Sequence, residues 1–186
     1  MPNSRALDQL QQVHELNRAF LALVQLRARE GRACFNLPPS LRRELAVAAP
    51  PLLEGVACFP RALFRAELTA ASAQAGADFD EAEHDLCLSV LLAARHASRH
   101  SAYQARLLFG LDAASVERLG AAPLAELQRL ASRPGVLQCA FSERHWFWPG
   151  LLTATRPELR RQLTLMALQP GIALDWPQRR PPHASC

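Results

Sequence analysis

Apolar residues recur along most of this chain with the period of an α-helix. Leu88, Leu91 and Leu92 lie three and four positions apart, which places them on one helical face. Leucine and alanine dominate the apolar positions and isoleucine is nearly absent. This balance favours helix, because β-branched side chains lose rotamer freedom there. The pattern predicts an all-α fold with only minor short strands.

Capping and breaking residues divide this pattern into short helices. Asp112 precedes AASVERLG as a helix-capping residue, and Pro123 opens LAELQRLAS as an early-helix proline. Gly120 and the pair Pro134-Gly135 are stop signals, after which VLQCAF predicts a short strand. The first half of the chain has the same order, with the segments LPPSLRRELA, PPLLEGVA and ALFRAEL.

The two halves show an internal repeat. Three residue types recur at a spacing of 74 positions, namely Phe35 and Phe109, Leu45 and Leu119, and Pro60 and Pro134. The triplet Ala48-Ala49-Pro50 answers Ala121-Ala122-Pro123 at a spacing of 73, and His14 answers His84 at 70. The smaller spacing at the start predicts extra residues in the first helix of the second copy. Leucine and alanine are so frequent that chance alignment is the alternative to duplication.

The repeat predicts a domain organisation with three further segments. Two similar helical domains are expected at residues 10–68 and 84–152, joined by a linker at 69–83 that is rich in Ala, Ser, Gly and acids. Residues 153–174 have no counterpart in the first copy and predict a helix-turn-helix-like extension. Residues 175–186 are dense in Pro and Arg and are expected to be flexible.

Composition and charge fit a globular protein and leave its partner open. Hydrophobic residues make up 49% of the chain and charged residues 20%, and the formal net charge is +4. All 21 cationic residues are Arg. A genome rich in G and C would produce this bias through codon usage. Arg also supplies a planar fork that matches phosphate and guanine edges.

Several classes of protein are disfavoured. The five cysteines form no CxxC or Cys/His pattern with metal-ligand spacing. No segment approaches the roughly 18 consecutive apolar residues that a membrane-spanning helix needs. His96 and His100 are spaced i, i+4, but neither an HExxH order nor a third ligand accompanies them. No nucleophile elbow, P-loop or dinucleotide motif is present. The sequence predicts no enzyme, no cofactor and no metal site, in a cytoplasmic protein with reduced thiols.

The second copy has an ordered series of features rather than one diagnostic motif. These are a long apolar helix, a Phe-x-Leu cap, a helix ending in Leu-Gly-Ala, a Leu-rich helix with an early Pro, and a strand with Cys and Phe, at Leu88–Ala93, Phe109–Asp112, Leu119–Ala121, Pro123–Leu130 and Leu137–Phe141. In this order the features resemble the FlhD family of flagellar transcriptional activators along nearly the whole length of the copy. The first copy resembles a degenerate version of the same domain.

The resemblance implies a helical subunit that dimerises, joins a zinc-containing FlhC subunit and activates promoters by binding DNA. Members of this family usually hold one copy, so a fused pair implies a covalent pseudo-dimer in a pseudo-twofold arrangement. The family can carry a cysteine at the position of Cys139, suited to an interchain bridge. The first copy has Arg65 at the equivalent place, so a symmetric bridge is lost. Flagellar genes and the transfer genes of mobile elements both remain open as targets.

Two segments hold the candidate contact residues. Arg144, His145, Trp146 and Trp148 come after the second predicted strand, and Trp and Arg are enriched in binding hot spots. They predict a contact surface for DNA or for the FlhC-like partner. The alternative is that Trp146 and Trp148 close the domain core.

The second segment is the predicted helix that starts at Thr155-Arg156-Pro157-Glu158. Its inward residues are expected to be Leu159, Leu163 and Met166, and its candidate phosphate contacts, together with those of the tail, are Arg156, Arg160, Arg161, Arg179 and Arg180. A solvated face is the alternative for these arginines.

Together these features predict a DNA-binding transcriptional activator subunit that acts in a hetero-oligomer with an FlhC-like subunit. With a net charge of only +4, the chain alone is expected to bind DNA poorly. The rival hypothesis is an adaptor or anti-activator that keeps the fold, has lost DNA contact and titrates an FlhC-like partner.

Overall fold

The computed structural model describes residues 3–68, 81–154 and 157–168. The first half of the chain contains α1 (Asn3–Arg29), α2 (Pro39–Val47), α3 (Pro50–Ala57) and β1 (Phe64–Ala66). The second half contains α4 (Glu81–His100), α5 (Ala102–Phe109), α6 (Ala113–Ala121), α7 (Leu124–Ala131) and β2 (Leu137–Cys139). The chain continues into α8 (Phe147–Thr153) and α9 (Pro157–Leu168). The predicted all-α fold with short strands is confirmed.

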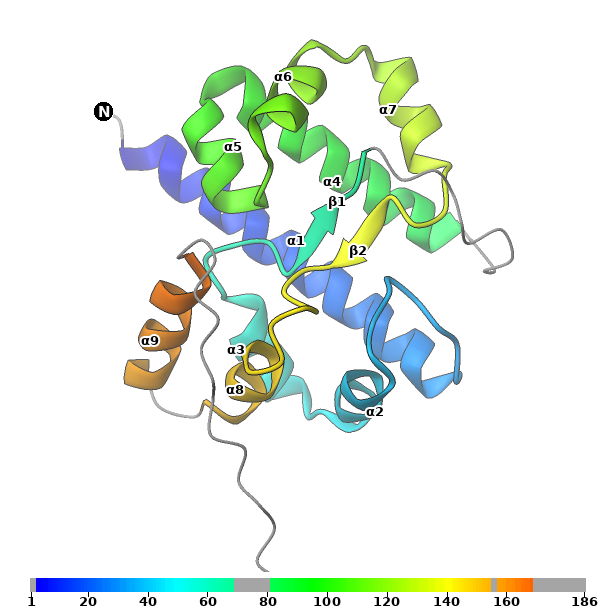
Figure 1. Cartoon of the computed structure of the whole chain (residues 1–186), viewed down its shortest axis with the longest axis vertical. Helices are drawn as coiled ribbons and strands as arrows, with labels where there is room; N and C mark the ends of the chain where they lie inside the picture. The colour runs from blue at the N-terminus through cyan, green and yellow to red at the C-terminus, as the bar shows by residue number, and fades with distance from the viewer. Residues whose placement is uncertain (1–2, 69–80, 155–156, 169–186) are drawn as a thin grey trace, which may run out of the picture.

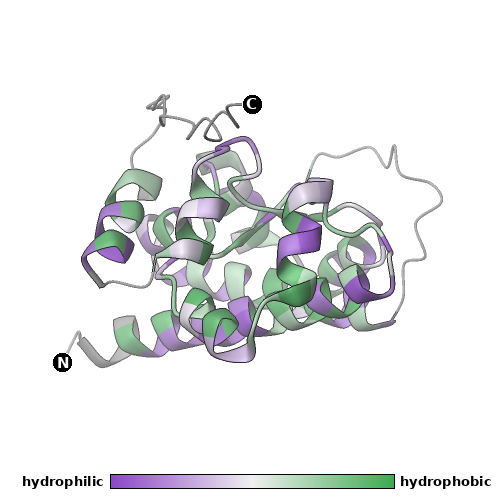
Figure 2. Cartoon of the chain, turned by 90° about the horizontal axis from the view of Figure 1, so that it is seen from below, coloured by the Kyte–Doolittle hydropathy of each residue, from purple (hydrophilic) through white to green (hydrophobic). Residues whose placement is uncertain are grey.

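The two long helices form one layer of the molecule. α1 and α4 pack side by side and run in opposite directions (Figure 1). α2 and α3 pack on α1, whereas α5, α6 and α7 pack on α4. Figure 2 shows the helix that starts at the N-terminus along one side of the molecule, with shorter helices stacked over it. Each described helix is too short or too polar to cross a membrane.

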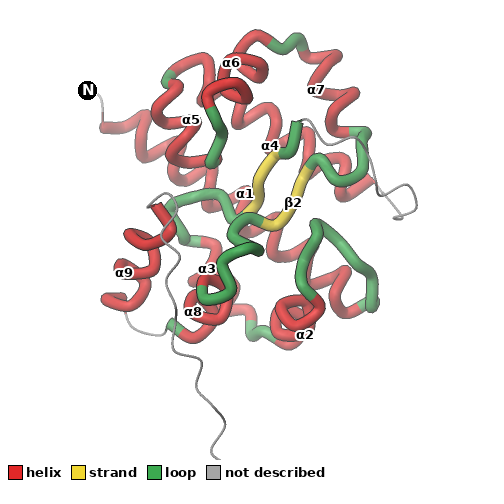
Figure 3. The backbone as a smooth tube through the Cα atoms, in the orientation of Figure 1, coloured by secondary structure: helices red, strands yellow, loops and turns green. Residues whose placement is uncertain are grey.

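The two strands form a small antiparallel sheet in the middle of the molecule (Figure 3). The paired residues are Phe64 with Cys139, Arg65 with Gln138, and Ala66 with Leu137. Beyond one end of the pair, the Ala140 N–H donates to the carbonyl of Leu63 at 2.9 Å. Beyond the other end, the Glu67 N–H donates to the carbonyl of Val136 at 2.7 Å. The hydrogen bonds on the two sides of the Arg65–Gln138 pair therefore mirror each other.

The short helices of the two halves share their lengths and their local conformation. α2 and α6 each have nine residues, α3 and α7 each have eight, and each pair begins 74 positions apart. Ala48 ends α2 with φ −61° and ψ 134°, and Ala122 ends α6 with φ −60° and ψ 130°. Asn36 and Gly110 both have left-handed backbones, with φ of 55° and 67°. The structural counterpart of Ala48 is thus Ala122, so the predicted match at a spacing of 73 is wrong by one residue.

The halves differ in the segment that comes after each long helix. α5 begins after Ser101, whose Oγ accepts the N–H of Gln104 at 3.3 Å, and it ends at the left-handed Gly110. The corresponding stretch of the first half, residues 30–38, contains no helix. The extra residues of the second half therefore lie in α5. The expectation that they lengthen the first helix is wrong.

A buried asparagine ties the first half together. Asn17 on α1 is fully buried, and its Nδ2 donates to the carbonyls of Ala57, Phe59 and Arg61 at 3.3, 3.2 and 3.0 Å. Its Oδ1 accepts the N–H of Leu63 at 2.9 Å. Buried backbone groups need such partners, because leaving them unpaired is costly. Asn17 thereby fixes the segment between α3 and β1 onto α1.

The observed elements fit only part of the predicted domain boundaries. α1 begins at Asn3, before the predicted start at residue 10. α4 begins at Glu81, so the last three residues of the predicted linker 69–83 are helical, while residues 69–80 lie outside the described residues. Buried side chains of both halves and of α8 and α9 belong to one continuous core. The division into two domains stays a prediction.

Candidate nucleic-acid and partner interface

Two helices follow β2 and dock on the body of the protein: α8 lies almost wholly at the end of the predicted second copy, and α9 lies in the predicted extension 153–174. α8 contacts α3, and α9 packs on α8. Leu163 of α9 is buried and lies so close to Gly150 that a Cβ atom there would be 3.0 Å from the leucine Cδ2. Met166 also packs against the core, whereas Leu159 is 45% exposed. The helix start at Pro157 and the inward positions of Leu163 and Met166 are confirmed, and the inward position of Leu159 is wrong.

Arg160 points back into the protein. Its Nε donates to the carbonyl of Ala154 at 2.9 Å, and its Nη1 donates to the carbonyl of Gly55 at 3.0 Å. Both acceptors lie at helix ends, where carbonyls lack partners within their own helix. Position 55 has no side chain to obstruct this contact, since a Cβ atom there would lie 2.6 Å from the Arg160 Nη2. The predicted solvent-facing position of Arg160 is therefore wrong.

Of the other candidate phosphate contacts, one lies among the described residues and three do not. Arg161, the next residue along α9, is exposed as predicted. Arg156, Arg179 and Arg180 lie outside the described residues. Within the described part of the extension, Arg161 is the predicted contact that faces solvent, and its contact with DNA stays a prediction.

The two tryptophans of the candidate partner surface are buried. Trp146 is 9% exposed and Trp148 is 3% exposed, and the indole N–H of Trp148 donates to the carbonyl of Ala140 at 2.9 Å. Phe147 lies between them in the chain and packs edge-on against both rings. The prediction that these tryptophans form a contact surface is wrong, because their rings fill the core around α8. His145 is exposed and Arg144 is half-buried.

Arg144 meets a second arginine at the carboxyl end of α9. Its Nη1 donates to the carbonyls of Met166 and Ala167, both at 3.1 Å. Arg61, from the segment between α3 and β1, donates to the same Ala167 carbonyl at 3.4 Å. The guanidinium carbons of Arg61 and Arg144 lie 5.3 and 5.6 Å from the centre of the Phe141 ring. Cations over aromatic faces are attracted by the ring quadrupole.

Burial and charge both act on Arg61. Its pKa is lowered, first by burial and then by the positive charge of Arg144. Its guanidinium also lies against Gly110, which has no side chain to obstruct it. Sequence reasoning missed Arg61, because no local pattern distinguishes it from the other arginines.

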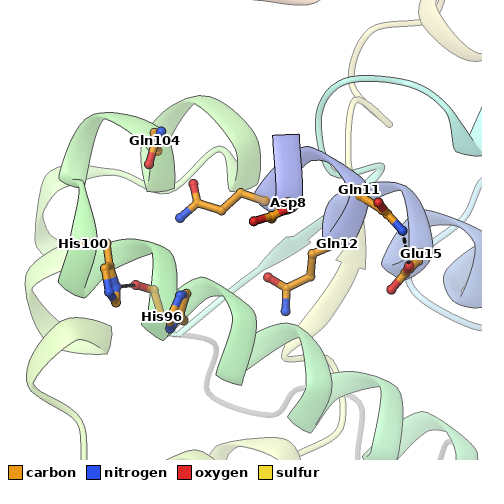
Figure 4. A pocket seen from close by; sticks show the side chains of 8 residues that line it. Asp8, Gln11, Gln12, Glu15, His96, His100 and Gln104 are labelled. Atoms are coloured by element: carbon orange, nitrogen blue, oxygen red, sulfur yellow. Dashed lines mark hydrogen bonds between the residues drawn. The ribbon is translucent and has the colours of Figure 1, made fainter. Parts of the chain in front are cut away.

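A polar cleft of about 820 Å³ lies between α1 and the junction of α4 and α5. Figure 4 shows side chains from α1 facing His96, His100 and Gln104 across it. The two imidazole rings lie 4.2 Å apart between centres, and His100 Nδ1 is 2.9 Å from the carbonyl of His96. Among the described residues, no group of three His, Cys, Asp or Glu side chains is placed to hold a metal ion.

Cys139 is the last residue of β2, and its side chain is buried. It is 1% exposed, and burial raises the pKa of its thiol to about 12. A bridge to a second chain needs an accessible sulfur, so this position does not suit the interchain bridge that the FlhD resemblance implies. Because β1 and β2 begin 73 positions apart, Cys139 corresponds to Ala66. The predicted correspondence with Arg65 is wrong, and Arg65 lies opposite Gln138.

The surface charge is spread over several helices. Arginine–carboxylate pairs between different segments include Arg18 with Glu54 at 2.9 Å, Arg118 with Glu126 at 3.3 Å, and Arg65 with Glu143 at 3.9 Å. Exposed arginines also lie on α4, α5 and α7 and just after α7, at Arg99, Arg106, Arg129 and Arg133. Exposed pairs of this kind contribute little to stability.

No family model, no curated protein and no solved structure matches this chain. The resemblance to FlhD thus rests on the order of its sequence features.

Proposed function

We propose that this chain is a DNA-binding transcriptional activator subunit resembling FlhD, which acts in a hetero-oligomer with an FlhC-like zinc subunit. The observation that carries the proposal is the arrangement of the two strands about the Arg65–Gln138 pair. FlhD-like proteins dimerise, so a single chain that reproduces a twofold relation between its halves fits a covalent form of such a dimer.

The strand register supports this interpretation in a specific way. Two equivalent antiparallel strands related by a twofold axis place each central residue opposite its own counterpart. β1 and β2 are both three residues long and begin 73 positions apart, and Arg65 and Gln138 are separated by the same 73 positions. A twofold axis through their midpoint would also exchange the flanking hydrogen bonds of Ala140 and Glu67. α2 and α6, and likewise α3 and α7, begin 74 positions apart, so the order of elements is the same and the path from α7 to β2 is one residue shorter than the path from α3 to β1.

Charge supports the need for a partner in DNA binding. Affinity for duplex DNA rises with the number of phosphates that a protein neutralises. A net charge of +4 over 186 residues supplies few such contacts. A second subunit would add cations and sequence readout. Flagellar genes and mobile-element transfer genes both fit as targets.

The second candidate function is an adaptor or anti-activator that titrates an FlhC-like partner without touching DNA. The position of Arg160 favours it, because a guanidinium bonded to Ala154 and Gly55 is withheld from phosphate. This candidate keeps the partner and removes the DNA contact.

A gel-shift experiment separates the two candidates. The chain, an FlhC-like protein from the same genome and both together are titrated against promoter DNA of flagellar or transfer operons. The activator is expected to shift DNA only weakly alone and to form a slower, sequence-specific complex with its partner. Loss of the partner's own shift on adding the chain would favour the anti-activator instead.

A variant pair sharpens this test. Arg161→Gln removes the exposed arginine of α9, and Arg129→Gln removes an exposed arginine of α7 as the matched control. If α9 contacts DNA, Arg161→Gln flattens the slope of log affinity against log salt by about 0.9, whereas Arg129→Gln leaves the slope unchanged. Equal slopes for both variants would argue against contact through α9.

A further inference from the structure

Two arginines from separate segments converge on one end of α9. Arg61 precedes β1 and Arg144 precedes α8, yet both donate to the carbonyl of Ala167. Both guanidinium groups also lie over the ring of Phe141. The carboxyl end of a helix carries about half a negative charge. The two planar guanidinium forks at the end of α9 therefore meet partial negative charge, and each uses one Nη1 atom for the contact in this structure.

Phosphate suits these two forks better than a helix end does. Guanidinium groups match phosphate oxygens in geometry and bind them through paired, charge-assisted hydrogen bonds. A phosphate group carries between one and two negative charges, which exceeds the charge of a helix end. The partly buried surroundings of Arg61 strengthen such interactions compared with bulk water.

We propose that Arg61 and Arg144 form a phosphate-binding site, that the carboxyl end of α9 occupies it in this structure, and that phosphate binding and α9 docking exclude each other. The inference rests on the proposed function only for the source of the phosphate, which is either a nucleic-acid backbone or a free phosphorylated small molecule. Phosphate at this site competes with the Met166 and Ala167 carbonyls for the same N–H groups.

Competition gives two changes of opposite sign. Removing one fork weakens phosphate binding directly. Loosening α9 removes the competitor and strengthens it. Leu163 serves this second purpose, because it anchors α9 against Gly150 and lies outside the contacts made by the arginines. A purely structural role for Arg144 predicts no gain of binding in any α9 variant.

The test uses the full chain and pyrophosphate as the probe, titrated by calorimetry into the wild type, Arg144→Gln, Leu163→Ala and the control Arg129→Gln. Arg144→Gln is expected to weaken binding at least tenfold, and Leu163→Ala to tighten it several-fold. Arg129→Gln is expected to match the wild type. Hydrogen exchange of the α9 amides is expected to quicken when pyrophosphate is added.

Two additions to this experiment identify the source of the phosphate and allow for a variant that does not fold. A DNA duplex of arbitrary sequence is titrated in parallel. Tighter binding of the duplex than of pyrophosphate indicates a nucleic-acid backbone as the source of phosphate, and tighter binding of pyrophosphate indicates a small molecule. If Arg144→Gln does not fold, Arg61→Gln takes its place, and Leu163→Ala still tests the gain. Absence of saturable binding of either probe to Leu163→Ala, or equal binding by wild type and Leu163→Ala, overturns the inference. The gel-shift experiment tests the proposed function separately. If the probes do not bind as expected but the chain and its partner still shift promoter DNA, only the phosphate site is refuted. If pyrophosphate binds as expected but the partner-dependent shift is absent, only the proposed function is refuted.

Discussion

α3 and α7 have the same length and begin 74 positions apart, but one glycine makes their outer surfaces different. Gly55 in α3 leaves room for the Arg160 side chain of α9. The residue 74 positions later, in α7, is Arg129, which is exposed and whose Nε donates to the carbonyl of Ala125 at 3.4 Å. An arginine on the outer surface of α7 obstructs the approach that a glycine permits. We therefore expect Gly55 to favour docking of α9 beside α3 rather than beside α7.

The two long helices differ in a similar way inside the core. Asn17 of α1 binds four backbone groups, whereas Cys87, 70 positions later on α4, is a buried thiol whose pKa burial raises to about 12. The first half therefore orders its strand-leading segment through a polar side chain. On α4, the corresponding position contributes a small apolar group to packing.

The largest expected effect on stability comes from replacing Asn17, and it tests the comparison of Asn17 with Cys87. Asn17→Ala removes the side-chain partner of two buried carbonyls, one buried N–H and the partly buried carbonyl of Arg61, and each buried group left unpaired costs about 1–3 kcal/mol. We expect a loss of roughly 3–5 kcal/mol in the free energy of unfolding, after partial relaxation. Cys87→Ala is the control and is expected to cost roughly 1 kcal/mol. Urea titrations followed by circular dichroism measure both, and similar losses for the two variants would contradict the comparison.

Local signals predicted the elements of this fold well. Asp112 accepts the N–H of Ser115 at 2.6 Å and begins α6, and α9 starts at Pro157, both as expected from the sequence. Such caps act within one helical turn, so the sequence around them contains the needed information. The spacing of 74 could be detected in the sequence, because residues in and between the short helices recur.

The candidate site was harder to predict, because it depends on contacts between distant segments. Arg160 is turned inward by Gly55, which lies 105 positions away, and Arg61 reaches Ala167 across 106 positions. A helical pattern reports which face is apolar and gives no information on which arginine finds a carbonyl in another segment. The contact surface predicted for Trp146 and Trp148 was wrong for a related reason. A run of aromatic residues beside charged ones is equally typical of a surface and of the edge of a core.

The pH dependence of the free energy of unfolding tests a difference between the two strands, since β2 has Cys139 where β1 has Ala66. The Cys139 pKa of about 12 lies above the ordinary thiol value near 9, so the folded state keeps the proton after the unfolded state has lost it. Stability is therefore complete below pH 9 and falls as pH rises toward 12, by up to about 1.4 kcal/mol per pH unit for this thiol.

Cys139→Ala is expected to reduce this alkaline decline by its own share, because burial also raises the thiol pKa of Cys34 to about 11 and that of Cys87 to about 12. The chain has no lysine that would titrate in the same range. Cys58→Ala is the control, because Cys58 is exposed. Urea midpoints between about pH 8 and 11 provide the measurement. An unchanged slope for Cys139→Ala would show that its thiol ionises as readily in the folded protein as in the unfolded chain.

A smaller effect is expected at the starts of α2 and α6. Asp112 caps α6 with its carboxylate, whereas Pro38, 74 positions earlier, gives α2 no side-chain cap. Asp112→Ala should cost about 1 kcal/mol near neutral pH. Hydrogen bonds from Ser115 lower the Asp112 pKa, so the cap contributes above the ordinary carboxyl value and is lost as pH falls through the lowered one. The wild type and Asp112→Ala should therefore converge in thermal stability at acid pH, and a difference that persists there would assign the loss to something other than the charged cap.

The smallest change in overall stability, with a large local consequence, is expected for Gly55→Ala. The new methyl group displaces the Arg160 guanidinium, which lies at the end of a flexible side chain, and α9 loses two hydrogen bonds. Alanine gains about 1 kcal/mol over glycine inside a helix, so the global free energy of unfolding should change by less than about 1 kcal/mol. The hydrogen bonds that hold α9 are each worth roughly 0.5–1.5 kcal/mol, so exchange of its amides should quicken about tenfold. Arg129→Ala, at the corresponding position of α7, should leave α9 exchange unchanged. If Gly55→Ala also leaves it unchanged while Leu163→Ala accelerates it, apolar packing holds the extension on α3, and the glycine does not select the docking side.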